Sequence, residues 1–282
     1  MSEAITDQST AFAPRKPWLA VLLSLIATGV GQVYNGQWKK GILFFLVESG
    51  VALLMVPTFG HFWGLLGCVL ILLGFNLYVI GDAFVSARKA HDYTVKTCNK
   101  MWVYALVICA GLVIGASVEG VIKGYFFQSF KIPSRSMIST FQVGDHFMSE
   151  ILDSDDVIKR GDIVVFLFPE DESKHFVKRV IGLPGDTLRI QDKVVLVDGQ
   201  ALDEPYVQHI KVGNQPDRDD LGPLVIGPDE YFLMGDNREA SYDSRWFGPV
   251  QRSAMVARAK YLYFPGDISS DDWLDRLGME LR

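Results

Sequence analysis

The run "MWVYALVICAGLVIGASV", from Met101 to Val118, is the feature that most restricts how this chain can fold. Its 18 uncharged residues would form a helix about 27 Å long, close to the roughly 30 Å hydrocarbon core of a membrane. Four basic residues precede the run between positions 88 and 100, whereas Glu119 and Lys123 follow it. Because basic flanks favour the cytoplasmic side, residues after Val118 are expected to be extracytoplasmic.

Three further apolar runs precede this segment: Trp18 to Tyr34, Gly41 to Val56, and Phe62 to Ile80. The last two are separated only by "PTFGH" and are expected to form a helical hairpin. The first run is short and is interrupted by Gly29 and Gly31, which leaves three possibilities open. It could cross the membrane, re-enter it, or lie at the interface.

The stretch "GVGQVYNGQWKKG", Gly29 to Gly41, resembles the turn of a small two-helix membrane module. That resemblance implies no defined chemistry. Glu48 lies within the following apolar run, where an ionisable side chain is costly. It is expected to face a polar group on a neighbouring helix, with a proton or substrate role as the alternative.

The two halves of the chain differ in charge, and this difference excludes some classes of function. Residues 1–118 carry a formal charge of +3, whereas the remainder carries −9 of the chain's total of −6. An acidic half lacks the basic stripe that phosphate binding needs, so no nucleic-acid partner is expected. The cysteines and histidines show no metal-ligand spacing, and neither a metal nor an organic cofactor is expected.

After Val118 the sequence changes to short runs rich in β-branched and aromatic residues, separated by Gly, Pro and Asp. The fold class predicted is therefore a set of N-terminal α-helical membrane segments followed by a mostly-β domain. "VDGQ" at Val197 to Gln200 is typical of a hairpin turn. The expected organisation is a tail at 1–17, a multi-helix membrane module with a cytoplasmic linker at 18–100, an anchor at 101–118 and an extracytoplasmic β domain at 119–282.

The stretch "FKIPSRSMIST" places Ser134 and Ser136 shortly after the membrane anchor. A serine nucleophile needs a neighbouring base, and His146 and His175 have no neighbours that suggest this role. Lys178 lies in the apolar run "HFVKRVIG", where it would share one strand face with Phe176 while Arg179 points the other way. One of the two basic side chains must then face inward, and only lysine can lose its proton there.

A third stretch, "MGDNREASYDSRWFGPV", contains alternating charges around two serines. In this order, and after a spanning helix, the three stretches resemble the type I signal peptidases, which are bacterial membrane-bound serine proteases of the Ser/Lys class. The resemblance covers about Phe130 to Gly266 and implies a β catalytic domain of the signal peptidase type.

The resemblance implies a role for each matching position. Ser136 would be the nucleophile and Lys178 the general base. The Ser136 backbone N–H and the Ser134 hydroxyl would form the oxyanion hole, and Ser241 would orient Lys178. Residues expected to support the site are Asp236, Arg238, Asp243 and Arg245. Residues expected to line the substrate pocket are Ile132, Pro133, Met137, Phe141 and Val177.

The chain departs from the family pattern at Ser139 and Phe141, where Pro and Leu are usual. Because Phe141 is bulkier than Leu, the sequence suggests a pocket narrowed to Ala or Gly for the residue before the cut. The N-terminal module is a second departure, because the family usually has one or two spanning helices.

The function implied is removal of N-terminal signal peptides from exported preproteins after a small-x-small site, through an acyl-enzyme. The expected location is the bacterial cytoplasmic membrane, with lipid as a partner and the secretion translocon as a further candidate partner. One alternative is a self-cleaving repressor-type protease, which the apolar runs disfavour. The other is an inactive membrane scaffold or assembly factor built on a peptidase-like domain.

Overall fold

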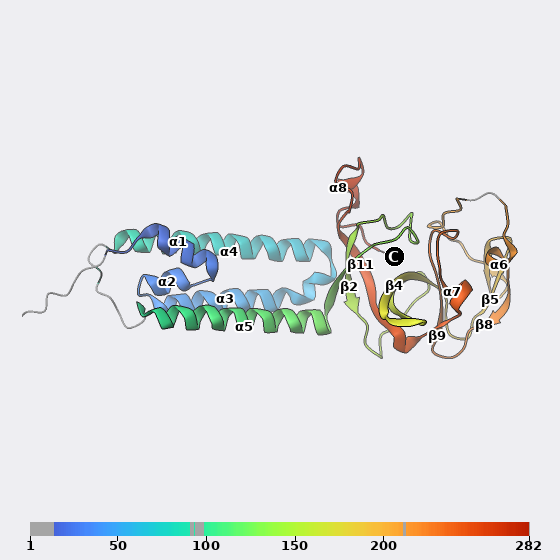
Figure 1. The fold of residues 1–282 in the computed structure, drawn as a ribbon, viewed down its shortest axis with the longest axis horizontal. Helices are drawn as coiled ribbons and strands as arrows, with labels where there is room; N and C mark the ends of the chain where they lie inside the picture. The colour runs from blue at the N-terminus through green and yellow to red at the C-terminus, as the bar shows by residue number, and fades with distance from the viewer. Residues whose placement is uncertain (1–13, 91–92, 94–98, 211–212, 282) are drawn as a thin grey trace, which may run out of the picture. The chain divides into compact units, whose positions relative to one another are not determined.

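The computed structural model of the protein describes residues 14–90, 93, 99–210 and 213–281 (Figure 1). Most of the predicted N-terminal tail, as well as Lys96 and Cys98, lies outside the described residues. The chain divides into two compact units. One comprises Met1–Phe59 with Gly64–Val121, and the other comprises Gly60–Trp63 with Ile122–Arg282.

The N-terminal unit is helical, and three of its described segments are long and apolar enough to cross a membrane. These segments are Trp38–Gly60, Phe62–Lys89 and Met101–Tyr125, with mean hydropathies of 2.1, 2.2 and 2.2. The prediction of N-terminal apolar helices before a mostly-β domain is thus confirmed, and the last helix continues past Val118 to Tyr125. The helices are α1 (Pro17–Ile26), α2 (Val30–Tyr34), α3 (Trp38–Met55), η1 (Val56–Gly60), α4 (Phe62–Lys89) and α5 (Met101–Tyr125).

The first apolar run folds as two short helices, α1 and α2, joined at Gly29. Helix α1 has 10 residues, so it rises only about 15 Å, roughly half of a hydrocarbon core. Gly29 has φ 87°, and a Cβ there would lie 2.2 Å from the Gly41 carbonyl oxygen. The predicted turn therefore depends on glycine both for its left-handed backbone and for this close approach.

Polar side chains tie this helical pair and α3 to α4. Gln32 and Asn35 donate amide hydrogen bonds of 2.8 Å to the carbonyls of Val79 and Ala83. Glu48 accepts a 2.6 Å hydrogen bond from Asn76 Nδ2. The structure thus places Glu48 against a polar group of the neighbouring helix, which is the first of the two possibilities that the sequence left open.

The second unit is mostly β and contains two antiparallel sheets. The larger sheet has the order β1-β2-β11-β3-β4-β9-β10, and the smaller has the order β7-β6-β5-β8. The strands are β1 (Phe127–Lys131), β2 (His146–Ile151), β3 (Ile163–Phe168), β4 (Asp171–Gly182), β5 (Thr187–Gln191), β6 (Val194–Val197), β7 (Gln200–Ala201), β8 (Leu221–Val225), β9 (Glu230–Met234), β10 (Val250–Gln251) and β11 (Met255–Phe264). Short helices are α6 (Pro216–Asp219), α7 (Ser244–Phe247), η3 (Arg252–Ala254) and α8 (Trp273–Arg276).

The turn predicted at "VDGQ" joins β6 to β7, because Val197 pairs with Gln200. Asp198 and Gly199 have φ of 51° and 80°, as a two-residue turn with both central residues left-handed requires.

Strand β4 lies inside the larger sheet and positions the residues of interest. It pairs with β3 through Val164 and Lys178, and with β9 through Arg179 and Met234. Core residues pack on both faces of this region, so Lys178 is 4% exposed and Arg179 is 1% exposed. The sequence required one of the two basic side chains to face inward, and the structure buries both, because β4 is covered on both of its faces.

Candidate active site

Ser136 lies in the segment that follows β1, and backbone hydrogen bonds fix this segment at both ends. The Ile132 N–H donates to the Asp145 carbonyl at 2.8 Å, and the Gly144 N–H donates to the Ile132 carbonyl at 2.8 Å. The Asn237 N–H donates to the Ser136 carbonyl at 3.1 Å. The nucleophile candidate is therefore held from two sides, and its side chain opens into a cavity.

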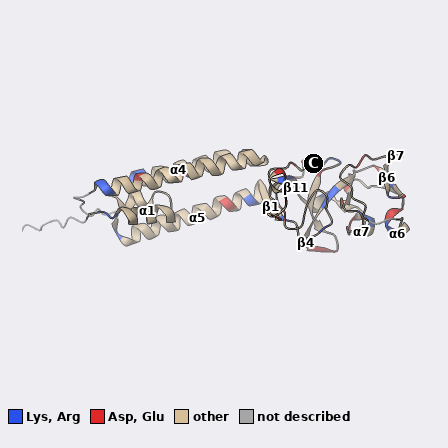
Figure 2. Cartoon of the chain, turned by 90° about the horizontal axis from the view of Figure 1, so that it is seen from above, with Lys and Arg blue, Asp and Glu red and all other residues tan. Residues whose placement is uncertain are grey.

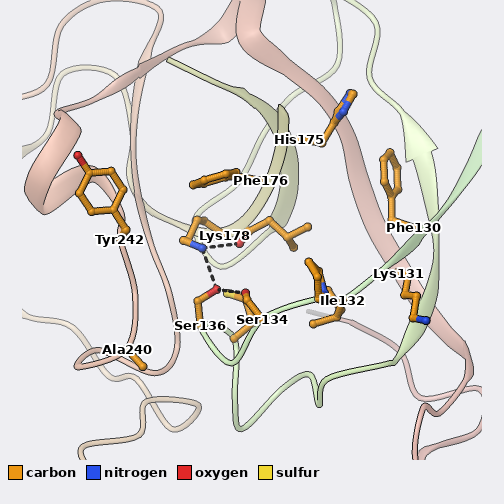
Figure 3. Close-up of a pocket in the computed structure, with 13 residues that line it drawn as sticks. Phe130, Lys131, Ile132, Ser134, Ser136, His175, Phe176, Lys178, Ala240 and Tyr242 are labelled. Atoms are coloured by element: carbon orange, nitrogen blue, oxygen red, sulfur yellow. Dashed lines mark hydrogen bonds between the residues drawn. The ribbon is translucent and has the colours of Figure 1, made fainter. Parts of the chain in front are cut away.

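Lys178 reaches Ser136 from the centre of β4, as Figure 3 shows. Its Nζ donates a hydrogen bond of 2.9 Å to Ser136 Oγ and one of 3.0 Å to the Val177 carbonyl. Two residues separated by 42 positions in the chain thus form a buried Ser–Lys contact. Hydrogen-bond contact between a nucleophile and its base is the geometry that proton removal from a serine requires.

Burial shifts the protonation equilibrium of Lys178 toward its neutral form. Burial lowers the pKa of Lys178 from 10.5 to about 8, against the opposing charges of Asp243 and Asp236. Arg245 adds a smaller lowering effect. Near neutral pH a fraction of the molecules therefore carries an amine that is able to accept a proton.

We expect kcat/KM to rise with pH through about 8 and to level off above it. Below that pKa the Lys178 amine is protonated and cannot take the Ser136 proton, whereas above it the amine is free. Cleavage of a peptide substrate measured between about pH 6 and about pH 10 checks this. A kcat/KM that stays low through pH 8 and is still rising at about pH 10, as expected for the ordinary lysine pKa of 10.5, would show that burial does not tune this base.

Ser134 lies beside the nucleophile, with its Oγ 3.3 Å from Ser136 Oγ. Its hydroxyl and the Ser136 backbone N–H are the two groups predicted to form the oxyanion hole. The structure brings Ser134, Ser136 and Lys178 together in one cavity (Figure 3). Ser139, by contrast, donates its hydroxyl to the Tyr206 carbonyl at 3.0 Å, so its contact is with the backbone.

Ser241 was predicted to orient Lys178, but the structure does not show that hydrogen bond. Lys178 Nζ uses Ser136 Oγ and the Val177 carbonyl instead. Ser241 is 7% exposed. Among the described residues its Oγ makes no hydrogen bond of normal geometry, although the hydroxyl contributes to lowering the Asp243 pKa. The Ser241 hydroxyl thus acts on Asp243, whose charge in turn acts on Lys178.

Asp236 forms a fully buried ion pair with Arg179. Arg179 Nε donates a hydrogen bond of 2.8 Å to Asp236 Oδ1, and Arg179 Nη2 donates one of 2.8 Å to Asp236 Oδ2. Thr140 Oγ1 donates a hydrogen bond of 2.5 Å to the same carboxylate. The Arg179 guanidinium also lies 3.9 Å from the centroid of the Tyr206 ring. Thr140 is the last residue of the first predicted stretch, Arg179 lies in the second and Asp236 lies in the third. This cluster therefore joins the three predicted stretches.

A second buried pair holds the loop that follows β9. Arg245 Nε and Nη2 each donate a hydrogen bond of 2.9 Å to the Asp243 carboxylate. Nη2 also donates a hydrogen bond of 2.6 Å to the Arg238 carbonyl. Burial alone would raise the Asp243 pKa, but the Arg245 hydrogen bonds and charge outweigh this effect and lower it. Arg238 pairs with Glu204, a partner that the local sequence pattern did not indicate.

The cavity around Ser136 has a volume of about 420 Å³. It includes Ile132, Pro133, Met137 and Val177, four of the five residues predicted to line the substrate pocket. The fifth, Phe141, is 0% exposed, and its ring lies 4.9 Å from that of Phe147 in the core. The expectation that Phe141 narrows the pocket was wrong, because the chain turns its ring into the core.

Other lining residues were not found by sequence reasoning. They are Phe130, Lys131, His175, Phe176, Ala240 and Tyr242. The alternation of β4 could have indicated Phe176, which shares a face with Lys178. No local signal marks Tyr242, because its place depends on how the loop after β9 folds back. Among the described residues, no group of His, Cys, Asp and Glu could hold a metal ion.

Comparison with known proteins finds a matching family model and several similar proteins. A family model described as signal peptidase, peptidase S26, matches residues 99–264. Signal peptidase I of Bacillus licheniformis is 30% identical over 174 residues, which cover 58% of this chain and 88% of that protein. Signal peptidase I S of Bacillus subtilis (strain 168) is 30% identical over 184 residues, covering 63% and 95%. A crystal structure of a signal peptidase I from Enterococcus faecalis V583 is 29% identical, with coverages of 36% and 96% and a TM-score of 0.30.

Proposed function

Because the chain belongs to the signal peptidase family, peptidase S26, we propose that Ser136 and Lys178 are the dyad with which it cuts preproteins. The protein is a serine endopeptidase that removes signal peptides. The assignment of the dyad rests chiefly on the 2.9 Å contact between Lys178 Nζ and Ser136 Oγ. The inactive scaffold is not favoured by these relatives.

The first half of the reaction forms an acyl-enzyme. Neutral Lys178 takes the Ser136 proton as Oγ attacks the scissile carbonyl, and negative charge develops on the carbonyl oxygen. The Ser136 N–H and the Ser134 hydroxyl donate to that oxygen, and each such donor is typically worth about 3 kcal/mol. Lys178 then gives its proton to the leaving amine, which is the new N-terminus of the mature protein.

The second half releases the signal peptide from Ser136. A water molecule takes the place of the departed amine, and Lys178 again accepts a proton as the water attacks the ester. Ser241 stays the proposed positioning residue for Lys178, and its hydroxyl would act through Asp243, whose charge acts on Lys178.

The cavity is lined by apolar side chains on the side expected to hold the residues before the cut. Ile132, Met137 and Val177 lie next to Ser136 there, and such a lining suits uncharged side chains such as Ala or Gly. We therefore keep the small-x-small preference as a proposal, on the basis of these three residues instead of Phe141.

The protein is membrane-anchored, and we propose that its β domain is extracytoplasmic. Figure 2 shows the long helices uncharged over most of their length, with most of their basic residues toward one end; Lys123 lies at the opposite end, in the last turn of α5. Arg88 and Lys89 form the last turn of α4, and Lys100 directly precedes α5. By the positive-inside rule this end is cytoplasmic, so α5 leads the chain out of the cytoplasm. Membrane lipid and the secretion translocon are the proposed partners.

One experiment tests function and orientation together. Purified protein in detergent with lipid should release the signal peptide from a labelled preprotein, and Ser136→Ala should release none because it lacks the attacking oxygen. The same substrate added outside sealed right-side-out vesicles should also be cut without detergent.

Cleavage by Ser136→Ala would contradict the dyad, and absence of cleavage by the wild-type protein would contradict the function. Cleavage only after the vesicles are opened would place the β domain on the cytoplasmic side. Ser139→Ala is the matched control, since that hydroxyl contacts the Tyr206 carbonyl and should leave cleavage in place.

A further inference from the structure

The cavity extends to both sides of the proposed dyad (Figure 3). Ser134 and Ile132 lie on one side of Ser136, whereas Ala240 and Tyr242 lie on the other. The scissile carbonyl oxygen of the substrate would point to the Ser134 hydroxyl. The leaving amine, on the other side of the cut bond, must lie within reach of Lys178. The residues that follow the cut therefore leave past Lys178, toward Ala240 and Tyr242.

Tyr242 belongs to the loop after β9 and presents a half-exposed aromatic surface. Tyr242 is 46% exposed, and the neighbouring Trp246 is 48% exposed. The two rings stack with an interplanar angle of 11° and centroids 6.5 Å apart. Phe168 and Phe247 support the Tyr242 ring at 6.1 and 5.7 Å. A surface of two supported, exposed rings is suited to contact a substrate side chain.

The charge next to this surface is negative. The Tyr242 hydroxyl donates 3.0 Å to Glu170 Oε1, and this carboxylate raises the Tyr242 pKa. Glu170 lies in the turn between β3 and β4, and the exposed Glu172 follows it, whereas Asp171 between them pairs with Lys174 at 2.7 Å. Donation to a carboxylate increases the electron density of the phenol ring, which strengthens its attraction for a cation.

We propose that Tyr242, with Trp246 and Glu170, forms a subsite for a basic side chain, lysine or arginine, at the first or second residue after the cut. This inference deepens the proposed function and rests on it. The ammonium or guanidinium would lie over the Tyr242 ring, with the Glu170 carboxylate at its edge. An acidic side chain in the same place would meet the carboxylates of the β3–β4 turn and be disfavoured.

The test compares preprotein substrates that differ only in carrying Lys, Gln or Glu at the first or at the second residue after the cut. For the full-length protein in detergent with lipid, we expect kcat/KM to be about three-fold higher for Lys than for Gln at one of these positions. The Glu substrate should be the poorest. In Tyr242→Leu the Lys-to-Gln ratio should fall to one, and in Glu170→Gln it should fall part of the way. Glu172→Gln, a neighbouring carboxylate without the Tyr242 contact, should keep the ratio.

A Lys-to-Gln ratio of one in the wild-type protein at both positions, or a ratio that survives Tyr242→Leu, would overturn the subsite. Equal loss of the ratio in Glu172→Gln and Glu170→Gln would also overturn it, because the effect would then be general charge. These results differ from a failure of the proposed function, in which the wild type would not cut the Gln substrate at all or Ser136→Ala would still cut it.

Discussion

Replacement of Lys178 by methionine is expected to lower kcat/KM by at least about 10³-fold, because Ser136 then has no group to take its proton. Methionine is of similar length and apolar, so it should fill the same buried space on β4. Since burial already disfavours the Lys178 charge, the folded state should be no less stable in the variant. The measurements are preprotein cleavage and the Tm of the purified protein in detergent.

Two further variants separate the loss of a base from other effects. Lys178→Arg keeps the positive charge but cannot be deprotonated, so it should be as inactive as Lys178→Met. Lys174→Met changes an exposed lysine on the same strand, whose side chain is 63% exposed, and should cleave normally. Activity in Lys178→Met above about a tenth of wild type would mean that another group removes the proton.

Replacement of Asp236 by alanine is expected to reduce the free energy of unfolding by about 3–5 kcal/mol, because it leaves a buried arginine without its partner. Both side chains of the pair are buried, with Arg179 at 1% and Asp236 at 0% exposure. Thr140 would lose its acceptor at the same time. Chemical denaturation in detergent, followed by intrinsic fluorescence, measures the change.

The control is Asp171→Ala, which removes the carboxylate of an exposed pair with Lys174 and should have little effect on stability. The double variant Arg179→Leu with Asp236→Leu should be less destabilised than Asp236→Ala, since it leaves no unpaired charge. If Asp236→Ala unfolds no more easily than Asp171→Ala, the buried pair does not hold the site together.

Much of the fold could be read from local patterns. The long uncharged runs indicated the spanning helices, because a helix in lipid must satisfy its own backbone and present apolar side chains along its whole length. The turn at Gly29 was marked by its glycines. The sequence left open whether the first apolar run crosses the membrane, re-enters it or lies at the interface. The structure shows this run as two short helices, of which α2 is tied to α4 through Gln32 and Asn35.

The side-chain directions within the β unit were less accessible from sequence. Alternation along β4 predicted that Lys178 and Arg179 point to opposite faces, but not that both faces are covered. Phe141 was expected in the substrate pocket and lies in the core instead. Tyr242 was not singled out, because its contact with Glu170 joins residues 72 positions apart.

The sequence by itself determined that this chain enters a membrane, that a β domain follows, and which serine and lysine could form a dyad. These properties depend on residue type and short-range spacing, which a sequence displays directly. Only the tertiary structure decided the 2.9 Å contact between Ser136 and Lys178, the burial that lowers the Lys178 pKa, and the two ends of the cavity. Those properties depend on the pairing of β4 with β3 and β9, which brings residues distant in sequence into a shared, water-poor space.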